Sequence, residues 1–182
     1  MARIAFLTAA LMKYPGGDPR LQDFVARFDA VFAAAEEFEG YITQPHKDGT
    51  IDEPTTPLPG FDQIEWDQRS ILTYSLWQNL ESVYAFTYTG PHGDALKNRG
   101  KWFPRPERPG FVAWWIADDH IPAWSEICER YEMLTQQGPT PEAFNFARPY
   151  GPDGKPTKIN RQLFQEKAAL HQPQRFSSTS EL

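Results

Sequence analysis

Hydrophobic residues in the first part of the chain form short continuous runs and helix-spaced stripes. Residues 3–12 are an apolar run rich in strand-compatible side chains, and Pro15, Gly16 and Gly17 follow closely. A short apolar run next to turn-forming residues is typical of a buried strand. We therefore predict a strand over 3–12.

A helix is predicted from Asp18 to Gly40. Asp18 followed by Pro19 is a typical helix start, because the carboxylate caps free N–H groups and proline fits the first helical position. Apolar residues then recur at spacings of three and four, which indicates a helix face that lies on a sheet. They are Leu21, Phe24, Val25, Phe28, Val31, Phe32 and Ala35.

A second strand is predicted over 41–44, after which the periodic pattern is lost over 45–68. This stretch holds four prolines and two glycines. A long irregular segment inside a compact domain is typical of a lid or binding loop. The alternative is a surface insertion without a function.

The pattern returns at residues 70–77, whose alternation predicts a strand, and Asn79 is placed to cap a following helix. Gly90 and Pro91 interrupt that helix, so a second helical piece is predicted from His92 to about Trp102. The run 111–117 is apolar throughout, which predicts a strand buried on both faces. A last helix is predicted from near Pro122 to Gly138. Its apolar face consists of Trp124, Ile127, Tyr131 and Leu134.

This order of elements predicts an α+β fold, namely a ferredoxin-like βαββαβ domain with an extra C-terminal helix. Such a domain carries its helices on one face of an antiparallel sheet. We expect a second subunit to cover the other face, giving a homodimer packed sheet on sheet. The domain is predicted over 1–150. Residues 151–182 form an extension with one peripheral helix over 158–172 and an end that is either disordered or clasps the partner subunit.

Composition narrows the classes of function. The 182 residues carry a net charge of −6, which argues against a nucleic-acid partner. No apolar run approaches the roughly 20 residues of a membrane span. Cys128 is the single cysteine, which excludes an intramolecular disulfide and a cysteine-based zinc site and favours a cytoplasmic protein. Aromatic residues make up 14% of the chain, more ring surface than a core of this size requires.

The candidate chemistry centres on His92. The sequence contains none of the common phosphate-binding, nucleophile-elbow or zinc-protease motifs. His92, Leu96, Arg99 and Phe103 fall on one helix face, where a purely structural helix would carry only apolar residues. A histidine in the first helical turn tends to be neutral, and Arg99 is suited to an anion or an oxyanion. The alternative is structural: a histidine bound to a nearby carbonyl and an arginine paired with a surface carboxylate.

The other titratable candidates are weaker. His46 lies in the 45–68 segment, where it either reaches a cavity or is solvated, and His171 lies in the extension. His120 precedes the last helix, where helix capping is favoured over a metal site, and no metal site is predicted. Cys128 is interpreted as a packed core thiol.

The sequence resembles the DUF3291 family. The matching run is YTGPHGDALKNRGKWF, preceded by SLWQNLESVYAFTY, and it follows the family pattern F-x-Y-x-G-x-H-x-x-x-L-x-x-R-x-x-W-F. The later run VAWWIADDHIPAWSEICERYEMLTQQGPTPEAFNF is similar to the second block of the family. The resemblance implies the dimeric α/β-barrel superfamily, which includes cofactor-free monooxygenases and haem-dependent enzymes. The 45–68 segment and the long tail depart from the family pattern.

Three functions remain open. The first is a small enzyme acting on a hydrophobic aromatic or polycyclic substrate, by cofactor-free oxygenation or by proton transfer, isomerisation or cyclisation. His92 would act as acid/base and Arg99 would stabilise negative charge. The second is a haem protein with His92 as axial ligand. The third is a non-catalytic dimer that binds a small ligand. Further substrate-binding candidates are Tyr88, Trp102, Phe103, Trp77, Trp115, Leu96 and His46.

Overall fold

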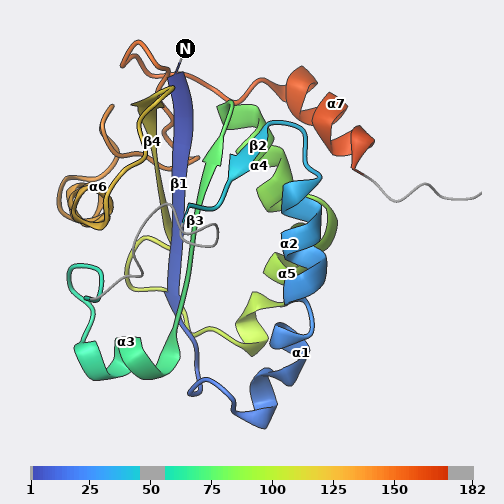
Figure 1. Cartoon of the computed structure of the whole chain (residues 1–182), viewed down its shortest axis with the longest axis vertical. Coiled ribbons are helices and arrows are strands. Elements are labelled where there is room, and N and C mark those ends of the chain that lie inside the picture. Colours follow the sequence, from blue (N-terminus) through green and yellow to red (C-terminus); the bar gives the residue numbers. More distant parts are fainter. Residues whose placement is uncertain (1, 46–55, 172–182) are drawn as a thin grey trace, which may run out of the picture.

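A four-stranded antiparallel sheet forms the centre of the computed structural model, which describes residues 2–45 and 56–171 (Figure 1). The strands are β1 (Ala2–Leu11), β2 (Tyr41–Thr43), β3 (Ser70–Trp77) and β4 (Phe111–Ala117), in the order β2-β3-β1-β4. The long β1 pairs with β3 on one side and with β4 on the other. The predicted strands and the α+β class are confirmed.

The helices are α1 (Gln22–Val25), α2 (Phe28–Glu36), α3 (Gln63–Arg69), α4 (Leu80–Tyr88), α5 (Gly90–Asn98), α6 (Trp124–Gln137) and α7 (Arg161–Leu170). Short 3₁₀ turns at Pro19–Leu21 and Arg99–Lys101 precede α1 and follow α5. The predicted caps form where the sequence places them: the side chains of Asp18 and Asn79 accept hydrogen bonds from backbone N–H groups two and three residues on.

Two predicted elements differ from the structure. The single helix expected between Asp18 and Gly40 is broken into a 3₁₀ turn, α1 and α2. The apolar residues of the two pieces are buried in different places: Leu21 and Phe24 pack with Trp102, and Ala35 is buried near the end of α2. In the stretch expected to be irregular, α3 forms because Asp62 accepts hydrogen bonds from the N–H groups of Ile64 and Glu65.

Helices cover both faces of the sheet, contrary to the prediction of an open face (Figure 1). One face of β1, with Ala5 and Leu7, is packed under Ile127 and Tyr131 of α6 and under Trp66 of α3. The opposite face, with Ile4 and Phe6, is packed under α4 and the chain after α6. The described part of the molecule therefore offers no bare sheet face for a second subunit.

The extension folds back on its own domain. In Figure 1, α7 lies beside α4, and the Phe164 and Tyr84 rings meet edge to face with centroids 5.4 Å apart. At the end of α7, His171 stacks on Phe38 at 3.8 Å and accepts a hydrogen bond from the N–H of Glu39. The end predicted to be disordered or to clasp a partner, 172–182, lies outside the described residues. Among the described helices, none is long and apolar enough to cross a membrane.

Candidate functional site

His92 sits where α4 ends and α5 begins. Gly90 adopts a positive φ of 55° at this junction, which turns the chain into the new helix. The turn brings the imidazole back onto the end of α4, where Nδ1 lies 2.8 Å from the carbonyl oxygen of Thr87. A carbonyl only accepts, so Nδ1 is the protonated nitrogen and donates this bond. The Nε2 atom is left as the acceptor.

Burial keeps the His92 ring neutral. Removal from water lowers its pKa below the ordinary value of 6.5, and this effect outweighs the hydrogen bond to Thr87, which acts in the opposite direction. At neutral pH the side chain is therefore an uncharged imidazole of fixed tautomer. Such a group accepts a proton or a hydrogen bond through Nε2.

Close helix packing fixes this arrangement. A Cβ atom added to Gly93 would lie 2.5 Å from the backbone oxygen of Tyr88. Only glycine allows α5 to approach the end of α4 this closely. Gly93 therefore lets the helix that carries His92 lie against the end of α4, next to the carbonyl that orients the imidazole.

The surroundings of His92 are aromatic. Its ring lies 5.0 Å from that of Phe86, which in turn contacts Trp77 at 5.1 Å and Phe38 at 5.9 Å. Trp77 is buried, and its indole N–H donates to the hydroxyl of Ser75. Of the predicted substrate-binding rings, Trp77 is thus the one that the structure joins to His92, through Phe86.

Arg99 and Tyr88 are exposed residues of the same motif. Arg99 lies in the 3₁₀ turn that follows α5, and Tyr88 is 46% exposed at the end of α4. Burial raises the pKa of Tyr88, and the charge on Arg99 opposes that increase. Among the described residues, no hydrogen bond, ion pair or ring contact joins Arg99 or Tyr88 to His92.

The remaining predicted substrate-binding residues lie in other parts of the molecule. Trp102 is buried with Leu21 and Met12, and Phe103 packs against the same cluster. Leu96 is half-buried on α5. The Trp115 indole N–H donates to the carbonyl of Tyr150 at 2.7 Å, on the side of the C-terminal segment. His46 lies outside the described residues.

A cavity of about 580 Å³ lies on that C-terminal side, in a part of the chain for which no site was predicted. Its apolar wall is formed by three rings: Tyr84 of α4, Phe164 of α7, and Phe146 of the segment between α6 and α7. The charged side chains that line it are Arg148, Lys158 and Arg161. The sequence does not predict this cavity, because the chain beyond Tyr150 is polar in composition. The signal that could have found it is the recurrence of aromatic and basic residues over 146–164.

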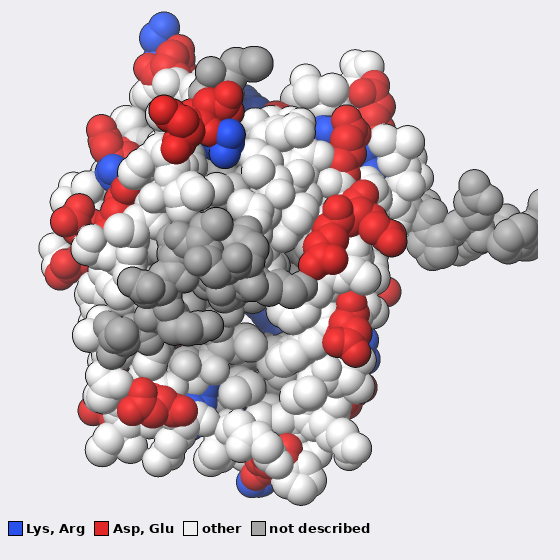
Figure 2. All heavy atoms as spheres, in the orientation of Figure 1, with Lys and Arg blue, Asp and Glu red and all other residues white. Residues whose placement is uncertain are grey.

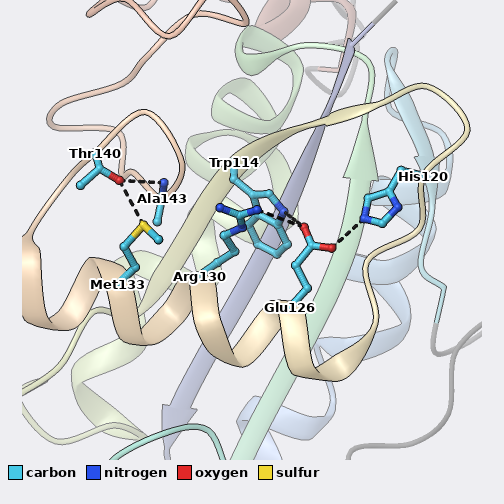
Figure 3. A network of polar contacts seen from close by, with 7 residues as sticks. All are labelled: Trp114, His120, Glu126, Arg130, Met133, Thr140 and Ala143. Carbon is cyan, nitrogen blue, oxygen red and sulfur yellow. Dashed lines mark hydrogen bonds and ion pairs between the residues drawn. The ribbon is translucent and has the colours of Figure 1, made fainter.

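A separate polar network joins β4 to α6 (Figure 3). Glu126 accepts hydrogen bonds from the Trp114 indole at 3.1 Å and from His120 at 2.6 Å. The guanidinium of Arg130, one turn along α6, lies 3.6 Å from the same carboxylate. The network ties the sheet to the helix that covers it. His120 bonds the Glu126 side chain in the first turn of α6, and no described side chain caps the N–H groups at the start of this helix, so the predicted capping by His120 is not seen. Among the described residues there is no group of three or more metal-ligating side chains.

Comparisons with known proteins give a family but no activity. The model of a family described as "Domain of unknown function (DUF3291)" matches residues 3–161. No curated protein matches the chain. Among solved structures, a structural-genomics protein described as YJCS is similar, with 15% sequence identity and a TM-score of 0.38, over 65% of this chain and 100% of that chain.

Proposed function

The chain belongs to the DUF3291 family, and we propose that it is a small enzyme acting on a hydrophobic aromatic or polycyclic substrate, with His92 as the acid/base. The observation that carries this proposal is the state of the His92 ring. Its Nδ1 is held by the Thr87 carbonyl, and burial lowers its pKa. A neutral, oriented imidazole is what a general base needs at neutral pH.

The chemistry follows from the free nitrogen. Nε2 would take a proton from an acidic carbon or hydroxyl of the substrate, and the resulting anion would be delocalised over the substrate's own rings. Such an anion is able to supply its own electrons to dioxygen and form a carbon–oxygen bond without a cofactor, which gives a peroxide anion that takes up a proton. Alternatively, it is reprotonated at another carbon in an isomerisation or cyclisation. Returning the proton from Nε2 restores the enzyme.

The aromatic surroundings of His92 support a substrate of this kind. Phe86 lies beside the imidazole and joins it to the buried rings of Trp77 and Phe38. A flat apolar substrate would pack on the Phe86 side of this aromatic cluster. Arg99 would act at the exposed end of α5, where a guanidinium attracts substrate carrying a phenolate or carboxylate.

The finer architecture belongs to the same proposal. The strand order β2-β3-β1-β4, with a helical connection from β1 to β2 and another from β3 to β4, supports the ferredoxin-like plan. A homodimer stays a prediction. Because α6 and α3 cover the described part of the face expected to be open, a dimer requires another surface.

The test uses anthrone, a tricyclic aromatic ketone with an acidic methylene group. Deuterium incorporation at that carbon is followed by NMR in D₂O, with oxygen consumption measured in parallel. The wild type should exchange the methylene protons faster than buffer, and His92→Ala should lose that acceleration while remaining folded. A wild type no faster than buffer on anthrone and its hydroxylated derivatives contradicts the proposal, as does full activity in His92→Ala.

A haem protein is the second candidate, and the same hydrogen bond favours it. A histidine that ligates a metal usually donates its other ring N–H to a carbonyl or carboxylate, as His92 does to Thr87. When bound, haem would supply redox chemistry through an iron held by His92 Nε2. The absorption spectrum of the protein with added haemin distinguishes the two functions. A Soret band of a histidine-ligated haem that disappears in His92→Ala supports this second function, and no such band supports the cofactor-free enzyme.

A further inference from the structure

We propose that the cavity between α4, α7 and the segment 146–161 binds a planar aromatic anion, at a site separate from His92. The cavity of about 580 Å³ falls in the range of small-molecule sites. This proposal does not depend on the proposed function, because none of the residues that line the cavity belongs to the His92 motif.

The charges that line the cavity all have one sign. Arg148, Lys158 and Arg161 line it, and no Asp or Glu does. This is unusual in a chain with a net charge of −6. Most charged side chains visible on the face shown in Figure 2 are acidic. Three cations around one hollow create a local positive potential that attracts an anion.

These cations also lack protein partners. Within the described residues, no hydrogen bond or ion pair of their side chains is formed. Nearby lysines of the same extension are neutralised: Lys155 pairs with Asp153 at 3.4 Å, and Lys167 pairs with Glu39 at 3.2 Å. Among the basic residues of the described segment 146–171, the three that remain unpaired are thus the ones around the cavity.

The apolar wall identifies the rest of the ligand. Tyr84 meets the rings of both Phe146 and Phe164, with centroids 5.1 and 5.4 Å away, at steep interplanar angles. Phe146 is fixed from behind by stacking on Phe6 at 5.5 Å. Edge and face positions of these rings suit another flat ring. An aromatic body with a carboxylate, sulfonate or phosphate group would contact the rings and the cations at once.

The free backbone N–H groups at the start of α7 already donate to a side chain, so the anionic group of the ligand is recognised by side chains. Asn160 caps the helix by accepting hydrogen bonds from the N–H groups of Gln162 and Leu163. Arginine and lysine therefore supply the donors to the ligand. Their solvent exposure makes each contact modest and sensitive to salt.

The test measures the affinity of two fluorescent ligands by titration. They are 8-anilinonaphthalene-1-sulfonate, which is an aromatic anion, and N-phenyl-1-naphthylamine, its uncharged relative. Each is titrated into the wild type, into Arg148→Ala/Lys158→Ala/Arg161→Ala, and into the control Lys97→Ala/Arg105→Ala/Lys155→Ala. The control also loses three positive charges, but at exposed positions that do not line the cavity. Thermal unfolding verifies that every variant is folded.

The proposal predicts that the wild type binds the sulfonate, that the cavity variant binds it about tenfold more weakly, and that the control and His92→Ala bind it as the wild type does. The uncharged relative should bind equally to the wild type and the cavity variant. Equal sulfonate binding by the wild type and the cavity variant overturns the proposal. So does an equal loss in the control or in His92→Ala, because the effect would then be general charge or a different site.

Discussion

Substituting Gly93 by alanine should destabilise the protein, against the usual behaviour of a helical glycine. In an exposed helix interior this change stabilises by about 1 kcal/mol, because alanine loses less backbone entropy. In α5, the added Cβ would lie 2.5 Å from the Tyr88 backbone oxygen and 2.7 Å from its carbonyl carbon. Both are backbone atoms, so no flexible side chain is able to move out of the way.

The size of the effect follows from three contributions. Overpacking against a fixed neighbour costs about 1–3 kcal/mol. Moving α5 away to relieve the clash also loses the His92–Thr87 hydrogen bond, at about 1 kcal/mol. The helix propensity of alanine offsets about 1 kcal/mol of this. The net destabilisation is about 1–3 kcal/mol, a decrease in Tm of roughly 3–10 °C for a chain of this length.

Urea and thermal unfolding measure this change, with Gly100→Ala as the matched control. An added Cβ at Gly100 meets no atom within 4 Å, so the control should be as stable as the wild type or slightly more stable. A Gly93→Ala protein as stable as Gly100→Ala would refute the close packing of α5 on α4. It would also remove the packing reason for a glycine at position 93.

Three further predictions concern other parts of the molecule. Folding lowers the pKa of His92, so its contribution to stability is complete above the unfolded pKa of 6.5 and is lost as the pH falls from there through the folded pKa. Over this pH range, the free energy of unfolding measured in urea should decrease more for the wild type than for His92→Gln. Parallel pH dependences of the two proteins would contradict this prediction. Glu126→Ala should cost about 1–3 kcal/mol, because it leaves the Trp114 indole without its acceptor, whereas Glu129→Ala on the exposed side of α6 should change the unfolding free energy by less than about 0.5 kcal/mol. Burial and the nearby Glu129 and Glu132 raise the pKa of Cys128 to about 11, so iodoacetamide should alkylate the native protein at pH 8 far more slowly than the urea-unfolded chain, and equal rates would contradict the packed thiol.

The sequence predicts the sheet and the helix break well because each has a local cause. Strand runs 3–12, 70–77 and 111–117 are continuous in the chain, and the break at Gly90 is marked by adjacent glycine and proline. The helix α3 was missed because prolines dominate its surroundings. Its cap, Asp62 with Glu65 three residues later, was the available signal.

What the sequence does not predict is which surfaces meet. The apolar stripe of α6 indicates that the helix packs, but only the three-dimensional path shows that Ile127 and Tyr131 cover the sheet face expected to be open. The helix spacing of His92 and Arg99 likewise places them on one face, while in the structure the first is half-buried and the second is exposed. The hydrogen bond from His92 to Thr87 spans five residues across a helix break and has no periodic signature.

The most direct test of the account is the protonation state of His92, measured by long-range ¹H–¹⁵N NMR of the imidazole over a pH titration, with His92→Gln used to assign the signal. The account predicts a neutral ring at pH 7 with the proton on Nδ1 and a pKa below 6.5. A ring protonated on Nε2, or a pKa at or above 6.5, would contradict the assignment of His92 as an oriented base.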